Sequence, residues 1–370
     1  MVADLRQLGF GPAVLEAFQA VPRHRLVPVF WEVSDGPWTT WREPVEHRAD
    51  DGDPRALELL YDIERALPTR RSGPDGVTTS ASAPRLLAAQ AGHLDLRPGM
   101  SVLEIGTGPG YFAALLAELV GPSGRVVTVE VDEEVAEAAT SRLAACGYDV
   151  EVVIGDGDAG APADAPFDRI VASVGCTDVA RAWLEQLAPG GFALVPLLHG
   201  ATHPILAVGA DGHGRVRIPS GYVSIQGRQA SVQLWPHARA GVETTEREPL
   251  PDNLWEVLTA APDDRTPLGG PLWALGFWVA VNDQRAAFLA ALNDGAGSSA
   301  TIDTSTWQVA WGGPTGRALA DDLLAHTTRW AELGAPSLAA FGHRFVLASG
   351  AHPSGLAIRR LDHDQLVDVP

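Results

Sequence analysis

The stretch V-L-E-I-G-T-G-P-G-Y at residues 102–111 decides the fold of this chain. A short apolar run precedes its glycines, and a helical pattern of apolar residues follows them. Glycines let the backbone turn tightly and bring a ligand against main-chain N–H groups, because a Cβ would fill that space. The stretch therefore predicts a strand, a ligand-binding turn and a helix.

The alternation of strand and helix continues on both sides of this turn. The expected helices cover residues 84–94, 111–120, 133–145 and 177–188, and the expected strands cover 101–105, 125–131, 150–154, 168–173 and 191–196. Strands that alternate with helices of this length indicate βαβ units and a parallel sheet with helices on both faces. The prediction is an α/β, Rossmann-like domain that binds its ligand at the carboxyl edge of the sheet.

The rest of the chain predicts additional modules. We expect a helix over 5–20, a polar surface excursion over 32–75, and an α+β pattern after about residue 235. In that last part the expected strands are 272–281 and 305–311, and the expected helices are 284–293 and 315–333. The predicted domains are a ligand-binding domain over 1–235, with 1–80 as a helical, substrate-side extension, and an accessory α+β domain over 236–370.

Charge and composition exclude several classes of function. The net charge of −19 and the pI of about 4.9 produce a field that repels phosphate backbones and anionic lipids. Nucleic-acid and membrane partners are therefore not expected. No apolar run approaches the roughly 20 residues that span a bilayer, and the first residues do not resemble a signal peptide. We expect a cytoplasmic protein.

The sequence indicates no metal site. The two cysteines lack the spacing of a thiolate cage. His199 and His203 have H-x-x-x-H spacing, but Gly200 and Pro204 oppose the helix that would bring both rings to one metal. We interpret that pair as part of a loop.

The spacing of the glycines separates two kinds of cofactor. A dinucleotide fingerprint requires glycine at the position of Tyr111, whereas E-x-G-x-G-x-G from Glu104 resembles motif I of methyltransferases that use S-adenosyl-L-methionine. The expected cofactor is therefore S-adenosyl-L-methionine. The predicted residues of its loop are Gly106, Thr107, Gly108, Gly110 and Tyr111.

Three acidic residues are expected to contact the ammonium group, the ribose and the adenine of this cofactor, in that order along the chain. Glu104, beside the loop, is placed to meet the ammonium group, directly or through water. Glu130 ends a strand about 20 residues beyond the glycines, where a carboxylate accepts both ribose hydroxyls. Asp156, followed by Gly157, ends the next strand and can accept a hydrogen bond from the adenine amino group.

Six successive motifs resemble those of the protein-L-isoaspartate O-methyltransferases. They are V-P-R-H at 21–24, T-T-S-A-S-A-P at 78–84, the stretch at 102–111, G-D-G at 155–157, F-D-R-I-V at 167–171 and L-A-P-G-G at 187–191. The resemblance implies that Ser82 touches both the cofactor and the substrate carboxylate, and that Thr79 and Ser80 line the cofactor side. A purely structural alternative is that Ser82 caps the helix that begins at Pro84.

The resemblance implies methyl esterification of an aspartyl or isoaspartyl carboxylate in a peptide or protein, followed by succinimide formation. The chain is longer than typical bacterial members by roughly 135 residues. In animal repair enzymes histidines follow the proline that corresponds to Pro84, and this chain lacks them. The added domain and the serine-rich segment 79–82 resemble actinobacterial relatives that modify an aspartate in a ribosomally made peptide. Repair and tailoring therefore both stay open.

Two other functions are compatible with the sequence. The chain could methylate a small natural product, since one fold serves many substrates. It could also be a non-catalytic protein that keeps the cofactor-binding fold, although an intact cofactor site opposes that interpretation.

Overall fold

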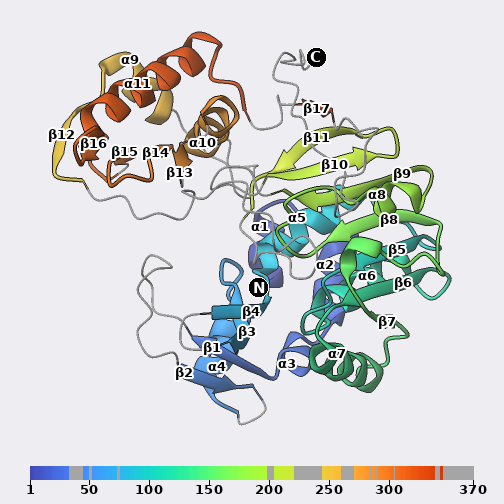
Figure 1. The fold of residues 1–370 in the computed structure, drawn as a ribbon. Helices are drawn as coiled ribbons and strands as arrows, with labels where there is room; N and C mark the ends of the chain where they lie inside the picture. Colours follow the sequence, from blue (N-terminus) through green and yellow to red (C-terminus); the bar gives the residue numbers. More distant parts are fainter. Residues whose placement is uncertain are drawn as a thin grey trace. The chain divides into compact units, whose positions relative to one another are not determined.

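The computed structural model describes residues 1–32, 45–49, 52–72, 76–197, 204–220, 244–259, 271–283, 285–287, 290–303, 305–337 and 342–344 (Figure 1). The chain divides into two compact units, and each is described by itself. The first contains the described parts of 1–175 and 180–195; the second contains 176–179, 196–220 and the described residues beyond 243. The predicted boundary at 235/236 lies outside the described residues, as do His199 and His203.

Five parallel strands form the centre of the first unit. They are β5 (Ser101–Ile105), β6 (Arg125–Glu130), β7 (Glu151–Ile154), β8 (Phe167–Ala172) and β9 (Leu187–Pro196), in the order β9-β8-β5-β6-β7. The central strands β5 and β6 are buried over nearly their whole length and contain the apolar runs expected of a strand covered by helices on both faces. The predicted α/β fold is confirmed.

The helices of this sheet follow the sequence pattern closely. The structure places α5 (Pro84–Leu94), α6 (Tyr111–Val120) and α7 (Glu133–Ala145) at the predicted residues. The predicted helix 177–188 is wrong in length, since α8 covers only Arg181–Glu185. Ala180, the residue before it, has an extended backbone with φ −63° and ψ 131°, so the helix does not begin earlier.

The amino-terminal part contains more regular structure than the sequence predicted. It holds α1 (Val2–Gln7), α2 (Pro12–Ala20), α3 (Arg23–Leu26), β1 (Val29–Glu32), β2 (Val45–Arg48), α4 (Pro54–Leu60), β3 (Leu67–Ser72) and β4 (Gly76–Ala81). The single helix predicted over 5–20 is wrong, because Gly9 has a φ of 83° and a new helix starts at Pro12.

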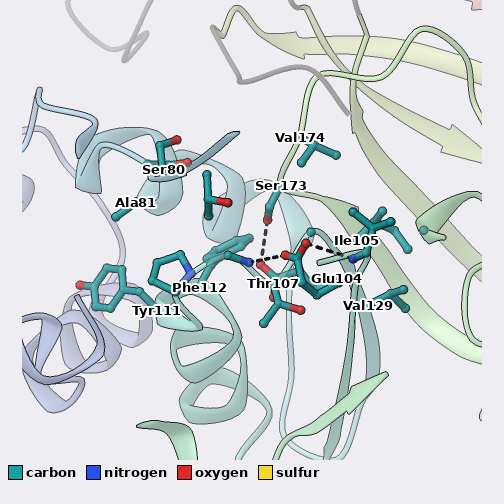
Figure 2. Close-up of a pocket in the computed structure, with 18 of the residues that line it drawn as sticks. Ser80, Ala81, Glu104, Ile105, Thr107, Tyr111, Phe112, Val129, Ser173 and Val174 are labelled. Carbon is teal, nitrogen blue, oxygen red and sulfur yellow. Dashed lines mark hydrogen bonds between the residues drawn. The ribbon is translucent and has the colours of Figure 1, made fainter. Parts of the chain in front are cut away.

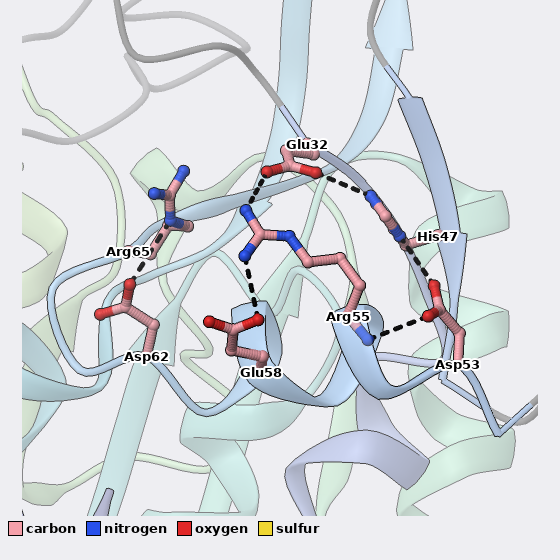
Figure 3. A network of polar contacts seen from close by, with 7 residues as sticks. All are labelled: Glu32, His47, Asp53, Arg55, Glu58, Asp62 and Arg65. Carbon is pink, nitrogen blue, oxygen red and sulfur yellow. Dashed lines mark hydrogen bonds and ion pairs between the residues drawn. The ribbon is translucent and has the colours of Figure 1, made fainter.

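The predicted polar excursion over 32–75 is also wrong for its described residues. The ring of His47 lies between the carboxylates of Glu32 and Asp53, at 3.0 and 3.2 Å, and Arg55 pairs with Glu32 as well (Figure 3). Phe30 stacks on the His47 ring on the buried side of β1. Short strands with charged outward-facing side chains have the composition of a loop, which explains the error.

The second unit contains two sets of antiparallel strands. One set is β10 (Ile205–Gly209), β11 (His213–Ile218) and β17 (Gly342–Arg344), which belong to the eight-stranded sheet that also includes β5 to β9. The other has the order β12-β16-β15-β14-β13, with β12 (Glu246–Pro249), β13 (Ala286–Ala287), β14 (Ala291–Asn293), β15 (Ser299–Asp303) and β16 (Gln308–Gly312). Its helices are α9 (Asp252–Thr259), α10 (Pro271–Asn282) and α11 (Gly316–Glu332).

The α+β character of this unit is confirmed, but several of its elements were mispredicted. The run 272–281 is helix α10 instead of a strand, and the predicted helix 284–293 contains the short strands β13 and β14. The strand predicted over 305–311 begins later, at Gln308, whereas the helix over 315–333 is confirmed as α11. A continuous apolar run does not distinguish a buried helix from a buried strand by its period. Among the described residues, none of the helices is long and apolar enough to cross a membrane.

Candidate cofactor and active site

A pocket lies at the carboxyl ends of β5, β6 and β8 in the first unit (Figure 2). Three segments line most of it: the end of β4 with the turn into α5, the glycine loop after β5, and the residues that follow β6 and β8. Ten of the twelve predicted site residues are in its lining: Thr79, Ser80, Ser82, Glu104, Gly106, Thr107, Gly108, Tyr111, Glu130 and Gly157. Gly110 and Asp156 are not among the lining residues.

The glycine loop is shaped by positive φ angles that other residues rarely adopt. Gly106 has a φ of 91°, and a Cβ there would lie 2.8 Å from Cγ1 of Val174. A Cβ on Gly157 would lie 2.6 Å from Cγ2 of Ile105. Gly110 has a different role, because it precedes α6 and packs against Leu143 of α7. The loop and the neighbouring turn thus form a cradle that only glycine leaves open.

Glu104 is a fully buried carboxyl group on β5. The hydroxyl of Thr128 donates to its Oε2 and the hydroxyl of Ser173 donates to its Oε1, both at 2.8 Å. Burial raises the pKa of Glu104 from 4.5 to about 8; the two hydroxyls oppose the rise, and the negative charge of Glu130 adds to it. A cation bound beside Glu104 would stabilise the ionised form.

Glu130 closes the glycine loop from the end of β6. Its Oε2 accepts a hydrogen bond from the Gly108 amide at 2.9 Å, and its Oε1 accepts from the amides of Val131 and Asp132 at 3.0 and 3.2 Å. These bonds fix both the carboxylate and the loop. They occupy three of the roughly four acceptor positions of a carboxylate, which leaves about one for a ligand hydroxyl.

Asp156 lies at the end of β7, where it caps a short turn of 3-10 helix over Gly157–Ala159. Its Oδ1 accepts from the Asp158 amide at 3.0 Å. The carbonyl of Gly157 accepts from the Trp183 indole at 2.7 Å, which anchors the turn. The expected role of Asp156 in adenine recognition stays a prediction.

Ser82 lies in the turn between β4 and α5 and is half-buried. The residue that caps α5 is Ala83, and no side chain caps that helix. The interpretation of Ser82 as a helix cap is therefore wrong. Its carbonyl accepts a hydrogen bond from Nη2 of Arg23 at 2.9 Å.

Sequence reasoning missed four residues around the pocket: Thr128, Ser173, Arg23 and Phe112. Thr128 lies opposite Glu104 in the register of β5 and β6, and Ser173 directly follows β8, which flanks β5 on its other side. A polar residue inside an otherwise apolar strand was the available signal for Thr128. For Arg23, the sequence supplied only its place in the V-P-R-H motif.

The chain matches known proteins over part of its length. A family model described as protein-L-isoaspartate(D-aspartate) O-methyltransferase matches residues 71–221. The protein-L-isoaspartate O-methyltransferase of Methanopyrus kandleri is 39% identical over 201 residues, which cover 53% of this chain and 75% of the relative. Protein-L-isoaspartate O-methyltransferase 2 of Archaeoglobus fulgidus is 35% identical over 213 residues, which cover 57% of this chain and 82% of the relative.

A solved structure named protein-L-isoaspartate O-methyltransferase shares the fold over almost the whole chain. The superposition has a TM-score of 0.53, covers 92% of this chain and 94% of the other, and gives 21% identity. At that identity the likeness concerns the fold alone.

The cofactor of this family is S-adenosyl-L-methionine, and the pocket fits its chemistry. The cofactor carries an ammonium group and a sulfonium, and the pocket presents two carboxyl groups, Glu104 and Glu130. A Cβ on Gly106 would narrow the cradle beside them. The matched motifs, the fold and the pocket agree, and the chain belongs to the protein-L-isoaspartate O-methyltransferase family.

Proposed function

We propose that this protein methylates the carboxylate of an isoaspartyl residue in a protein or peptide. One observation carries the proposal: the segment Thr79–Ser82 lines the same pocket as the glycine loop and the two carboxyl groups Glu104 and Glu130. A substrate carboxylate at Ser82 would therefore share a pocket with the cofactor. The names of the relatives support the same substrate class.

The proposed cofactor contacts follow from the lining of the pocket. Glu104 holds the ammonium end and Glu130 accepts from a ribose hydroxyl. The main-chain amides of Gly106–Gly108 approach the cofactor directly, with no side chain between. Thr79 and Ser80 cover the cofactor from β4, and Tyr111 forms part of the wall. Gly110 shapes the loop from behind, and Asp156 with Gly157 is assigned to the adenine end.

The proposed chemistry requires little of the protein beyond placement. When bound, the cofactor supplies a methyl group on a positively charged sulfur. A carboxylate is already ionised at neutral pH, so no side chain has to remove a proton from it. The Ser82 hydroxyl donates a hydrogen bond to one carboxylate oxygen and directs the other toward the methyl group. Such positioning contributes several kcal/mol to lowering a barrier.

The product explains why such an enzyme would be useful. A methyl ester has a better leaving group than a free carboxylate. The neighbouring backbone amide nitrogen attacks the ester carbonyl, methanol leaves with the amide proton, and a succinimide ring forms. Hydrolysis of that ring gives aspartyl or isoaspartyl peptide, which makes the sequence suitable for repair.

Tailoring of a ribosomally made peptide uses the same steps and was suggested by the added length of the chain. We favour repair, because relatives that match this chain at 39% and 35% identity are named protein-L-isoaspartate O-methyltransferases. The expected cytoplasmic location and the absence of nucleic-acid and membrane partners stay predictions.

The test is methyl transfer from radiolabelled S-adenosyl-L-methionine to an isoaspartyl peptide and to its normal aspartyl twin. Base-labile label on the isoaspartyl peptide alone is the expected result. Label on the aspartyl twin would favour tailoring. No label on either peptide, with binding of S-adenosylhomocysteine intact, would exclude the proposed substrate.

A further inference from the structure

Arg23 is a fully buried cation next to the pocket. It begins helix α3, and its side chain is 0% exposed. Its Nη2 donates to the Ser82 carbonyl at 2.9 Å, and its guanidinium carbon lies 4.6 Å from the centre of the Tyr111 ring. Ser82 and Tyr111 both line the pocket. One side chain thus supports two parts of the pocket wall.

The charge of Arg23 has no anionic partner among the described residues. None of the ion pairs in the described ranges includes Arg23, and neither its Nε nor its Nη1 has a hydrogen-bond partner there. Tyr111 faces the guanidinium with both its ring and its hydroxyl, and the hydroxyl of Tyr61 contributes more weakly. A guanidinium does not lose its proton in a protein, so the buried charge persists.

Burying an unpaired charge is costly, and a cation–π contact with one carbonyl bond compensates only part of that cost. Replacing the arginine by an apolar residue would fill the same space with less penalty. The position of the charge therefore suggests a benefit in a state that contains a further anion. The proposed reaction brings one, a carboxylate, to Ser82.

We propose that Arg23 is a positioning residue that makes the Ser82 side of the pocket selective for an anionic carboxylate over its neutral forms. This inference rests on the proposed function. Arg23 fixes the Ser82 backbone through its hydrogen bond and supports the Tyr111 wall by stacking. Ser82 and Tyr111 separate its charge from the bound carboxylate, and the attraction between the two charges is strong because little water lies between them to screen it.

The same charge distinguishes substrate from product. The isoaspartyl carboxylate carries a negative charge, whereas its methyl ester is neutral. The attraction to Arg23 is therefore lost when the ester forms, which favours release of the product. A neutral carboxamide analogue of the peptide imitates the product in charge and the substrate in size.

The experiment compares binding of the isoaspartyl peptide and its carboxamide analogue by calorimetry, using full-length protein loaded with S-adenosylhomocysteine. The variants are Arg23→Gln, which removes the charge, and Arg23→Lys, which keeps it. Arg25→Gln is the matched control, because Arg25 is exposed on the same helix. Binding of S-adenosylhomocysteine reports whether each variant retains its folded pocket.

We expect Arg23→Gln to weaken binding of the carboxylate peptide about tenfold more than it weakens binding of the carboxamide, while S-adenosylhomocysteine still binds. Arg23→Lys and Arg25→Gln should both keep the preference for the carboxylate. If Arg23→Gln fails to fold, Arg23→Lys becomes the test. This variant keeps the positive charge, so loss of its preference for the carboxylate peptide over the carboxamide would overturn the inference.

Equal weakening of both peptides by Arg23→Gln would show a purely structural role and would also overturn it, as would a wild-type protein without preference for the carboxylate. Binding is measured without turnover. A failure of methyl transfer in the wild type would therefore count against the proposed function, and an unchanged binding preference in Arg23→Gln would count against Arg23.

Discussion

The amide of Gly108 donates a hydrogen bond of 2.9 Å to Oε2 of Glu130, so the acid at the end of β6 holds the glycine loop that follows β5. The other carboxylate oxygen accepts from the amides of Val131 and Asp132, which fixes the turn into α7. One side chain thereby joins two adjacent strand ends at the cofactor side of the sheet.

Replacing Glu130 should weaken cofactor binding more than it weakens the fold. We expect Glu130→Gln to reduce affinity for S-adenosylhomocysteine by about tenfold or more, because an amide cannot accept hydrogen bonds at both ends. Glu133→Gln is the control, since Glu133 is exposed three residues further on. Calorimetry measures both. Equal affinity for the two variants would contradict a role of Glu130 in the site.

Binding of the cofactor should release a proton from Glu104. The raised pKa of about 8 leaves this carboxyl group largely protonated at pH 7, and a bound ammonium group would lower that pKa. Calorimetry in buffers with different ionisation enthalpies measures the released proton. The Glu104→Gln variant should bind the cofactor without releasing a proton. Proton release that is the same in both proteins would assign it to another group.

The same carboxyl group should make the free protein more stable in mild acid. The folded pKa of about 8 exceeds the ordinary value of 4.5, so the folded state binds the proton more tightly than the unfolded chain. The resulting stabilisation is complete below about pH 4.5 and is lost as the pH rises through about 8.

Denaturant unfolding at several pH values tests this dependence. Wild type should lose, relative to Glu104→Gln, on the order of a few kcal/mol of unfolding free energy between pH 5 and pH 8. If the unfolding free energies of wild type and Glu104→Gln changed with pH in the same way, the raised pKa of Glu104 would be contradicted.

The cradle at Gly106 should not tolerate a side chain. Gly106→Ala meets two penalties, a φ of 91° and a contact of 2.8 Å with Val174. Gly147→Ala is the matched control, because its φ of 84° imposes similar strain with nothing within 4 Å of the added carbon. We expect Gly106→Ala to cost about 1–3 kcal/mol more unfolding free energy than the control. Equal costs, measured by denaturant unfolding, would show that the contact with Val174 is unimportant.

Ser82 should affect turnover without affecting stability. Since Ser82 does not cap α5, Ser82→Ala should leave the midpoint of thermal unfolding nearly unchanged. The lost hydroxyl should lower kcat by about tenfold, and Ser82→Thr should restore part of it. Steady-state kinetics with the isoaspartyl peptide measures both variants. A large fall in the unfolding midpoint would mean that the hydroxyl is structural after all.

The sequence predicted those parts of the molecule whose physics is local. Apolar strands that end in glycine or an acid located β5, β6 and the loop, and Pro84 marked the first turn of α5. The partners of Glu104 were not predictable, because Thr128 and Ser173 meet it only through the register of three parallel strands.

Non-local packing explains the remaining failures. Arg23 contacts Ser82, 59 positions further along the sequence, and no local sequence pattern predicts such a contact. The run 272–281 is apolar on every side, so its burial was evident but its helical form was not. The short strands β13 and β14 contain alanine and leucine, which favour helices, and their pairing with a neighbouring strand prevails over that preference.

The most direct test of the proposed function identifies the atom that receives the methyl group. Full-length protein is incubated with S-adenosyl-L-methionine and an isoaspartyl peptide, and the product is mapped by fragmentation in a mass spectrometer. The expected product is a methyl ester on the isoaspartyl carboxylate, which then loses methanol to form the succinimide. A methyl group on any other atom, or an unmodified peptide in the presence of bound cofactor, would contradict the proposed function.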